Sequence, residues 1–320
     1  MSQRQWVVTG AAGFLGSHVV EKLLLANASV LAIDNLSWGR REHLSPFEAN
    51  PNFSFHDFDI RDTGGLSSLL QKGRPSVVIH LAALHFIPAA IADPPLAVSI
   101  NVHGTQSVLT ACRHAKVESF WFASTGDVYC PSESPHREDS PVAPFNIYGL
   151  TKLMSEQLIA LEARELPERR FIVGRLFNLY GTRETNPHIL PEILSQLRER
   201  PHGPLRLGNI WPHRDMVPVD EAAKAIIDCV ERSPIGLTTV NVATGRAWSI
   251  QDVIETIGKL RHQPVTVETD PDKVRAVERP HLQADVGRLK DLIGWTPNPD
   301  LRRGLKELVA YEHNLSTSAS

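Results

Sequence analysis

The chain has 320 residues, of which 42% are hydrophobic and 22% charged, and its net charge is −3. This composition is ordinary for a globular protein, and the length exceeds the size at which one hydrophobic core stops growing, so we expect a large domain and a smaller one. The weak negative charge gives no sign of a protein that binds nucleic acid or a membrane surface.

The cysteines and the start of the chain predict a cytoplasmic protein. Cys112, Cys130 and Cys229 contain no Cys-x-x-Cys pair, and we interpret all three as reduced thiols. The first residues lead directly into a strand-like run, without the apolar region of a signal peptide. The apolar stretches of the chain are too short to span a bilayer.

Short β-rich runs alternate with helical stretches in the first half of the chain. Near-continuous apolar runs of this kind are typical of parallel strands that are covered on both faces. The alternation predicts an α/β fold with an open, doubly wound parallel sheet of the Rossmann type. The predicted strands are 6–9, 30–33, 53–56, 76–80, 120–123 and 172–175, and the predicted helices are 14–25 and 95–114.

The second half is less regular and predicts a smaller domain that is interleaved with the first. A proline- and histidine-rich stretch covers 182–218, and the patterns that follow are helix-like at 220–232, 249–260 and 301–313 and strand-like at 239–242. We predict an NAD-binding domain formed by 1–176 plus 214–245, a C-terminal substrate domain formed by 177–213 plus 246–314, and a disordered Ser/Thr-rich tail at 315–320.

A glycine-rich turn follows the first predicted strand and opens the first helix. Glycine permits a positive φ and lets backbone N–H groups approach a pyrophosphate, and the helix N-terminus adds roughly half a positive charge. Tight strand–helix turns also use glycine, but the place of this turn within a β–α–β unit favours a dinucleotide site. The residues concerned are Gly10, Gly13, Phe14, Leu15 and Gly16.

Asp34 strengthens the prediction of a dinucleotide site. It ends the second predicted strand, 18 residues after Gly16, close to the spacing of about 20 residues expected for an acid on the adenosine ribose. A carboxylate there accepts hydrogen bonds from the ribose hydroxyls and repels a 2′-phosphate, so NAD is favoured over NADP. The alternative is a solvated strand-end turn formed with Asn35.

Several other residues are candidates for contact with the same dinucleotide. They comprise an acid that could meet the adenine, small residues that would let the cofactor pass, and an asparagine that could bond backbone near the nicotinamide. Each is individually explained as well by a structural role, and their weight comes from their common location near the strand ends. These residues are Asp59, Ile60, Leu81, Ala82, Ala83 and Asn101.

Tyr148 and Lys152 are four positions apart at the start of a predicted helix, so their side chains share one helix face. A free tyrosine has a pKa near ~10, and a role as a base at neutral pH requires a shift of about 3 units. A nearby ammonium and a cationic nicotinamide ring would supply much of that shift by favouring the phenolate. A Tyr-x-x-x-Lys spacing is common by chance, but downstream of a glycine-rich cofactor motif it indicates catalysis.

The segment Ser124-Thr125-Gly126-Asp127 ends the predicted strand 120–123. A hydroxyl here would bond the reacting oxygen of a substrate, whereas the simpler interpretation is a Ser/Thr turn that caps the strand. Asp127 is either a second acid/base group beside that oxygen or a solvated turn residue, and the sequence leaves both open.

Together these residues identify a resemblance to a known family. The chain resembles the extended short-chain dehydrogenase/reductases, and among them the NAD-dependent nucleotide-sugar epimerase/dehydratase family that includes UDP-galactose 4-epimerase. The resemblance runs from Trp6 to about Tyr311. It rests on motifs that occur in order: the glycine turn, His80-Leu81-Ala82-Ala83, Asn101 with Gly104-Thr105, the Ser-Thr…Val-Tyr segment 124–129, Tyr148 with Lys152, 175–181, Arg214-Asp215 and 292–297.

The resemblance implies roles for the candidate residues. Thr125 would supply the catalytic hydroxyl, and Tyr148 would be the base that takes the proton from a sugar hydroxyl while hydride passes to the nicotinamide. Lys152 would hold the ribose and lower the pKa of Tyr148. Phe177 would lie along the nicotinamide.

The resemblance also implies a site for a nucleotide-diphosphate sugar. Asn178 would contact the substrate diphosphate, and Arg214 and Arg279 would grip the diphosphate or its ribose, which suits guanidinium geometry. A surface ion pair is the alternative for either arginine alone. His85 is a further candidate for contact with the substrate, although a polar loop residue is the simpler interpretation.

Two departures from the family patterns bear on the reaction. The glycine that usually follows the Val-Tyr pair is Cys130, which we interpret as a packing change. The dTDP-glucose 4,6-dehydratases have Thr-Asp-Glu where this chain has Thr125-Gly126-Asp127, which argues against that reaction. UDP-glucuronate decarboxylases and GDP-mannose dehydratases have Thr, a small residue and Glu, of which Asp127 would be a shortened version, and simple 4-epimerases usually have no acid there.

We therefore predict an NAD-dependent nucleotide-sugar 4-epimerase that acts through a transient 4-keto sugar. The first alternative is a dehydratase or decarboxylase that uses Asp127 as a second acid/base. A second alternative is an inactive NAD-binding sensor or scaffold, against which the presence of Thr125, Tyr148 and Lys152 speaks.

Two further predictions concern metals and partners. We predict no metal site, because His80, His85 and His103 lack ligand spacing such as His-Glu-x-x-His. We also predict a homodimer, as in the family, through helices around 97–114 and 150–163.

Overall fold

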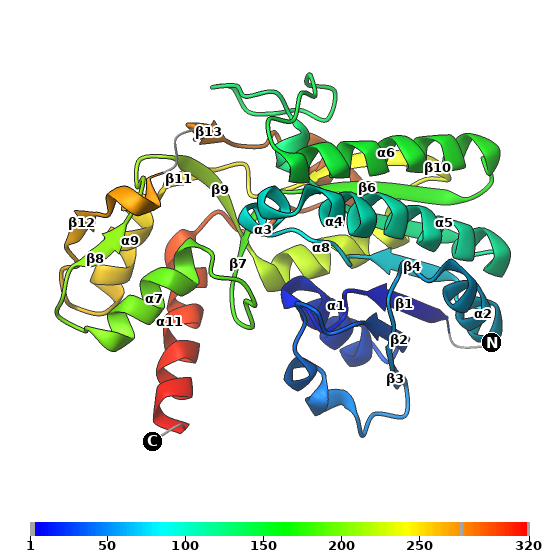
Figure 1. The fold of residues 1–320 in the computed structure, drawn as a ribbon, viewed down its shortest axis with the longest axis horizontal. Helices are drawn as coiled ribbons and strands as arrows, with labels where there is room; N and C mark the ends of the chain where they lie inside the picture. Colours follow the sequence, from blue (N-terminus) through cyan, green and yellow to red (C-terminus); the bar gives the residue numbers. More distant parts are fainter. Residues whose placement is uncertain (1–3, 275–277, 319–320) are drawn as a thin grey trace.

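The computed structural model describes residues 4–274 and 278–318. Its centre is a seven-stranded sheet in which all neighbouring strands are parallel, in the order β10-β6-β5-β4-β1-β2-β3 (Figure 1). The strand order reverses beside β1, as in a doubly wound sheet, so the predicted fold class is confirmed. The strands are β1 (Gln5–Thr9), β2 (Ser29–Asp34), β3 (Phe53–Asp57), β4 (Val77–His80), β5 (Ser119–Thr125), β6 (Arg170–Leu176) and β10 (Gly236–Val242).

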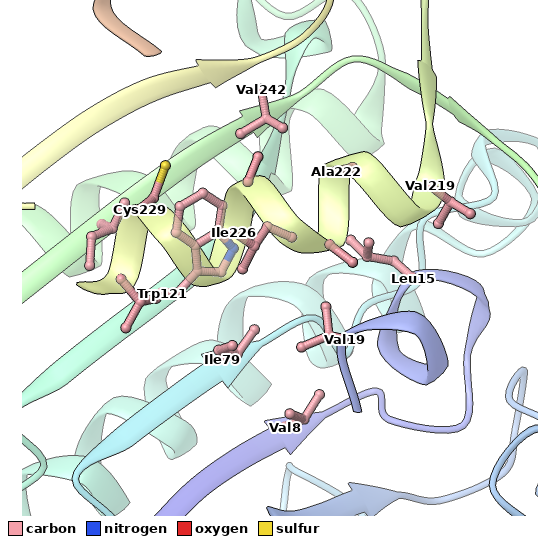
Figure 2. Packing of buried hydrophobic residues seen from close by; sticks show 14 of the residues in the cluster. Val8, Leu15, Val19, Ile79, Trp121, Val219, Ala222, Ile226, Cys229 and Val242 are labelled. Carbon is pink, nitrogen blue, oxygen red and sulfur yellow. The ribbon is translucent and has the colours of Figure 1, made fainter. Parts of the chain in front are cut away.

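Helices cover both faces of this sheet, because alternate strand residues point to opposite sides and both sides are apolar. Val8 and Ile79 lie in one core with α1 and α8, whereas Val7 and Val78 lie in a second core with α2, α5 and α6. Figure 2 shows the first core, where Val19 of α1 and Ile226 of α8 face the strands. The helices are α1 (Phe14–Leu25), α8 (Val219–Arg232), α2 (Thr63–Gly73), α5 (Gly104–Ala115) and α6 (Ile147–Glu165).

In the first core, a tryptophan ring packs directly against a glycine. Trp121 on β5 is fully buried (Figure 2), and its ring lies against Gly174 on the paired strand β6. A Cβ atom on Gly174 would lie 1.9 Å from Cζ2 of Trp121. Glycine at this position therefore creates the space for the tryptophan ring.

The smaller region has its own core and two small sheets. β9 pairs with β7, β11 and β13, and β8 pairs with β12. A third apolar core joins β7, β8, β9, β11 and β12 to α7, α9 and α11, while α10 packs against α8 of the large region. The elements are β7 (Asn178–Tyr180), α7 (Ile189–Glu199), β8 (Leu205–Leu207), β9 (His213–Pro218), β11 (Ala247–Ser249), α9 (Ile250–Leu260), β12 (Val267–Thr269), β13 (His281–Leu282), α10 (Gly287–Ile293) and α11 (Leu301–Ser318).

The chain passes between the two regions more than once. It leaves the large sheet after β6, and it contributes α8 and β10 before it leaves again with β11. β9 pairs only with strands of the small sheet, so the return to the large sheet begins at α8. The division into 1–176 plus 214–245 and 177–213 plus 246–314 stays a prediction in its bounds.

Two helical segments differ from the sequence-based prediction. The predicted helix 95–114 consists of α4 (Pro94–Val98), a π-helical turn (Ser99–His103) and α5, and the short helix α3 (Ile87–Ala92) precedes them. At the other end, α11 is described as far as Ser318, and the disordered tail at 315–320 stays a prediction. Serine and threonine cost only a few tenths of a kcal/mol relative to alanine in a helix, so a helix already held by its apolar face continues through them. Among the described residues, no helix is long and apolar enough to cross a membrane.

We predict that Gly174→Ala lowers the free energy of unfolding by about 1–3 kcal/mol, because overpacking a filled core displaces the ring of Trp121 or separates two paired strands. Unfolding in urea, followed by circular dichroism, measures the change. Gly64→Ala is the matched control, because its Cβ atom would lie 3.7 Å from the nearest heavy atom and alanine favours the helix α2. Equal stability of the two variants would contradict the packing analysis.

Candidate active site

The carboxyl ends of the central strands open into a cleft of about 1570 Å³ that residues of both regions line. Parallel sheets commonly bind ligands at such a switch point. With the exception of Asn101, every residue that the sequence predicted for the site lines this cleft. These are Gly10, Gly13, Phe14, Leu15, Gly16, Asp34, Asp59, Ile60, Leu81, Ala82, Ala83, His85, Thr125, Asp127, Tyr148, Lys152, Phe177, Asn178, Arg214 and Arg279.

Two glycines of the first turn are required by close backbone contacts. Gly10 has a φ of +71°, and a Cβ atom there would lie 2.7 Å from the backbone nitrogen of Ala82. A Cβ atom on Gly16 would lie 2.0 Å from the carbonyl oxygen of Gly10. Gly13 is the N-cap of α1 and offers no side chain to the first-turn N–H groups, so these donors suit a phosphate.

Asp34 at the end of β2 is buried against the glycine turn rather than solvated. Its Oδ2 accepts a hydrogen bond from the N–H of Ala12 (3.0 Å), and its Oδ1 accepts one from the N–H of Leu36 (2.8 Å). Burial raises the pKa of the carboxyl, and the two N–H donors act in the opposite direction. The carboxylate is therefore fixed at the edge of the cleft, with acceptor capacity remaining for a ribose hydroxyl.

The second acid of the predicted dinucleotide site has a cationic partner that the sequence did not indicate. Asp59 forms an ion pair with Arg61 (2.6 Å) and accepts a hydrogen bond from Nδ2 of Asn35 (3.1 Å). The hydrogen bond from Arg61 is the main reason why the pKa of Asp59 falls to about 2. Arg61 also lines the cleft, so the end that the sequence predicts to bind adenine carries a neutralised ion pair.

Asn101 does not line the cleft, and its side chain bonds backbone groups of the segment after β4, so its contact with the cofactor stays a prediction. Its side chain is 1% exposed and accepts a hydrogen bond from the N–H of Leu84 (2.7 Å). Its amide group donates to the carbonyl oxygen of Leu84 (3.1 Å) and to Oγ1 of Thr151 (2.9 Å). The asparagine thus joins the segment after β4 to the helix that carries Tyr148, because the π-helical turn directs it inward.

Tyr148 and Lys152 project into the cleft from the first turns of α6. Asn146 caps this helix by accepting a hydrogen bond from the N–H of Gly149 (2.8 Å). Nζ of Lys152 donates to the carbonyl oxygen of Ala123 (2.8 Å) and lies 6.0 Å from the centre of the Tyr148 ring. The predicted pair is therefore assembled on one helix face, beside the end of β5.

The electrostatics of this pair differ from the expectation. Burial raises the pKa of Tyr148, the charge of Asp127 raises it further, and a hydrogen bond with Thr125 lowers it. Burial also lowers the pKa of Lys152 to about 7, against the opposing charge of Glu156. Nζ of Lys152 is directed at the carbonyl oxygen of Ala123, and its effect on the pKa of Tyr148 stays a prediction. The protein's own groups keep the phenol neutral.

Thr125 and Asp127 adjoin the phenol at the end of β5. Thr125 is 7% exposed, and its Oγ1 accepts a hydrogen bond from the N–H of Asp127 (3.2 Å). Oδ1 of Asp127 lies 3.5 Å from Nη1 of Arg279. Asp127 is therefore an ion-paired residue of the cleft, whereas the sequence left open a solvated turn.

The two arginines predicted to bind a diphosphate both have protein partners. Arg279 is 3% exposed and donates to the carbonyl oxygens of Gly126 (3.2 Å) and Tyr129 (3.0 Å). Arg214 donates to Glu278 (2.7 Å) and to the carbonyl oxygen of Arg279 (2.8 Å). These bonds hold the segment after β5 in place, and the roles of both arginines toward a ligand stay predictions.

Phe177 and Asn178 lie at the junction between β6 and β7. Phe177 is buried, and its ring centre lies 6.5 Å from that of Tyr129. Asn178 is exposed to the cleft. The structure thus brings the predicted substrate residues to the same cleft, and their individual contacts with a ligand remain predictions.

His85 belongs to a cluster that the sequence analysis missed. One ligand atom from each of His85, Glu184 and His188 lies within 4.8 Å of the other two, and all three residues line the cleft. Burial is the main cause that lowers the pKa of His85 to about 4 and raises that of Glu184 to about 7. Glu184 and His188 are four residues apart, but His85 comes from a distant segment, so no local spacing could signal the whole cluster.

The fold and the cleft match known proteins over nearly the whole chain. The family model described as GDP-mannose 4,6 dehydratase matches residues 7–308. A putative UDP-glucose 4-epimerase of Methanocaldococcus jannaschii is 32% identical over 315 residues, which make up 96% of this chain and 98% of that protein.

Two solved structures illustrate the similarity of the fold. The UDP-glucose 4-epimerase of Thermotoga maritima, solved with UDP-glucose, has a TM-score of 0.88 at 28% identity and covers 98% of this chain and 99% of its own. The UDP-glucuronic acid 4-epimerase of Bacillus cereus, in complex with UDP-glucuronic acid and NAD, has a TM-score of 0.87 at 29% identity. The match covers 97% of this chain and 99% of that protein's chain.

The fold and the tyrosine–lysine cleft thus define a member of the extended short-chain dehydrogenase/reductases. Within that class, the chain belongs to the NAD-dependent nucleotide-sugar epimerase/dehydratase family, which confirms the resemblance inferred from the sequence.

The low pKa of Lys152 predicts a specific dependence of stability on pH. The pKa is about 7 in the folded protein, below the ordinary value of 10.5 in an unfolded chain. Between these values the unfolded chain binds the proton that the folded protein has lost, so the contribution of Lys152 to stability rises with pH. Relative to Lys152→Met, the parent should gain up to about 1 kcal/mol per pH unit from pH 7 to 10.

Urea unfolding at several pH values, on protein freed of bound nucleotide, measures this difference. Lys72→Met removes an exposed lysine from α2 and controls for the loss of one positive charge. A constant difference between the parent and Lys152→Met across this range would show that the buried ammonium keeps an ordinary pKa.

Proposed function

We propose that the protein is an NAD-dependent nucleotide-sugar 4-epimerase that acts through a transient 4-keto sugar. The observation that carries this proposal is the meeting of Tyr148, Thr125 and the glycine turn of β1 in one cleft. The epimerases among its relatives support the class of reaction.

The residues of the large region fit a dinucleotide. Gly10 and Gly16 permit the close backbone contacts that shape the turn, and the first-turn N–H groups of α1 are the donors proposed for a pyrophosphate. Asp34 accepts from the ribose hydroxyls and repels a 2′-phosphate, which favours NAD. Bound NAD supplies the hydride acceptor and, through its cationic ring, the positive charge that the protein's own groups do not give Tyr148.

The reaction then follows from the groups at the end of β5. Tyr148 takes the proton of the sugar 4-hydroxyl while the C4 hydride leaves, so a C–O single bond becomes C=O. Thr125 hydrogen-bonds the same oxygen and keeps it beside the phenol. After the keto sugar rotates, Tyr148 returns the proton and C4 receives the hydride on its opposite face. No atom is gained or lost, and the configuration is inverted.

Asn178, Arg214 and Arg279 are the groups proposed to hold the nucleotide diphosphate. Their side chains reach the cleft from the junction of the two regions. The relatives named above act on uridine diphosphate sugars, which supports UDP-hexoses as the first substrates to test.

Asp127 favours a second candidate reaction, a dehydration or decarboxylation after oxidation. Its carboxylate is near enough to Tyr148 to raise the pKa of the phenol, and the family model bears the description of a dehydratase. In that reaction Asp127 would move a second proton at the 4-keto sugar, and the product would lack water or carbon dioxide.

We also propose a homodimer that resides in the cytoplasm. Exposed apolar side chains gather on the helices predicted for the interface, among them Val98, Leu150, Met154 and Leu161. None of the three cysteines, all within the described part of the chain, forms a disulfide, which fits a reducing compartment.

We predict that Tyr148→Phe lowers turnover by about 10²- to 10⁴-fold, because general acid–base catalysis by the phenol is lost. NAD content measured after purification should stay unchanged, since the glycine turn is intact. Tyr129→Phe is the matched control: Tyr129 donates to Asn241 (2.7 Å) outside the cleft, so its turnover should stay close to that of the parent. Parent-like turnover of Tyr148→Phe would overturn the assignment of the base.

Asp127→Asn separates the two candidate reactions. An epimerase should retain most of its turnover, whereas a dehydratase or decarboxylase should lose it. Products from a panel of UDP- and GDP-sugars are analysed by mass and by chromatography against the 4-epimers. A product of unchanged mass that co-elutes with the 4-epimer supports epimerisation. A loss of about 18 mass units (one water) or about 44 mass units (one carbon dioxide) supports the second candidate.

A further inference from the structure

Three side chains with metal-binding atoms meet in the cleft although no motif joins them in the sequence. His85 follows β4, whereas Glu184 and His188 lie between β7 and α7. One ligand atom of each lies within 4.8 Å of the other two. Ligands bound to one Zn²⁺ at 2.0–2.2 Å are about 3.4 Å apart in a tetrahedral site, so small side-chain movements would bring these atoms to coordinating positions.

Neighbouring contacts orient two of the three candidate ligands. Oε1 of Glu184 accepts hydrogen bonds from the backbone N–H groups of Thr185 (3.0 Å) and Asn186 (3.1 Å). The ring centres of His85 and His188 are 6.0 Å apart, and Phe86 packs edge-on against His188 at 5.6 Å. Contacts of this kind fix the orientation of ligands around metal sites.

Asn186 lies beside this cluster and has a buried amide oxygen without a partner in the described part of the chain. Its side chain is 3% exposed, and its Oδ1 atom has no hydrogen-bond partner among the described residues. Its Nδ2 lies 3.0 Å from Nε2 of His85. A buried amide oxygen without a partner costs free energy, so this oxygen, in a side chain that contacts His85, requires an explanation.

We propose that His85, Glu184 and His188 bind one divalent transition-metal ion at this place in the cleft. Two imidazoles and one carboxylate are a ligand set of Zn²⁺, Fe²⁺, Mn²⁺ and related ions, and three protein ligands leave at least one coordination position open. In a cleft that also holds Tyr148, this position is accessible to an oxygen atom of a ligand.

The charge balance suits an oxygen-rich ligand. The carboxylate of Glu184 neutralises one of the two charges of the ion, and the remaining charge would attract a hydroxyl, carboxylate or phosphate oxygen. The claim that the ion contacts a sugar oxygen rests on the proposed function. The claim that the three side chains bind the ion does not. The two claims are therefore tested separately.

The experiment measures metal binding by the full chain, without reference to turnover. Purified protein is treated with a chelator, dialysed and titrated with Zn²⁺ by calorimetry, and the bound metal is counted by elemental analysis. We expect one Zn²⁺ per chain with a micromolar or tighter Kd. Titration with Co²⁺ should produce a visible absorption spectrum, because the d-electrons of Co²⁺ report nitrogen and oxygen ligands.

The variants His85→Asn, His188→Asn and Glu184→Gln should each weaken Zn²⁺ binding at least 10- to 100-fold and remove the Co²⁺ spectrum. Circular dichroism checks that each variant is folded. His213→Asn is the matched control, because His213 and His281 have the same ring separation of 6.0 Å. The inference is overturned if the parent binds Zn²⁺ no more tightly than about 1 mM, or if His213→Asn weakens binding as much as the other variants do.

Discussion

The position of α6 on the end of β5 is the constraint on which the rest of the site depends. Lys152 donates to the carbonyl oxygen of Ala123, and Ser124 donates to Glu156 one turn further along the helix. Glu156 in turn forms a buried ion pair with Arg175 on β6 (2.7 Å). Because these bonds connect a helix to two adjacent strands, a rotation of α6 that would move its phenol away from the strand end breaks a buried charge pair.

The position of α6 also buries both Lys152 and Tyr148, which determines their charge states. Burial disfavours the ammonium of Lys152 and the phenolate of Tyr148 alike, and Asp127 opposes the phenolate further. The fold thus holds Tyr148 and Lys152 in environments that disfavour the charged form of each side chain. Such local cost is commonly concentrated where a protein carries out chemistry.

Much of this architecture could be predicted because it depends on local pattern. The apolar runs gave the central strands, the helix at 14–25 matches α1, and the glycine spacing identified the turn that Gly10 and Gly16 require. Residues whose role depends on distant partners could not be assigned. Asn101 turned out to brace Leu84 and Thr151, and the cluster around His85 needed Glu184 and His188 from another segment. The burial of Tyr148 and the charge of Asp127, which both raise the pKa of the phenol, could not be predicted either, since spacing along a helix does not report what surrounds a side chain.

The interleaved path of the chain has a consequence for biosynthesis. β10 pairs with β6, yet Gly236–Val242 emerges from the ribosome only after the intervening segments of the smaller region. Until then, β6 is paired with β5 on one side only, and its other edge offers backbone donors and acceptors to other chains. A nascent or prematurely terminated polypeptide that ends before residue 236 is thus expected to be prone to aggregation and dependent on chaperones, even though most of its nucleotide-binding half has already been translated.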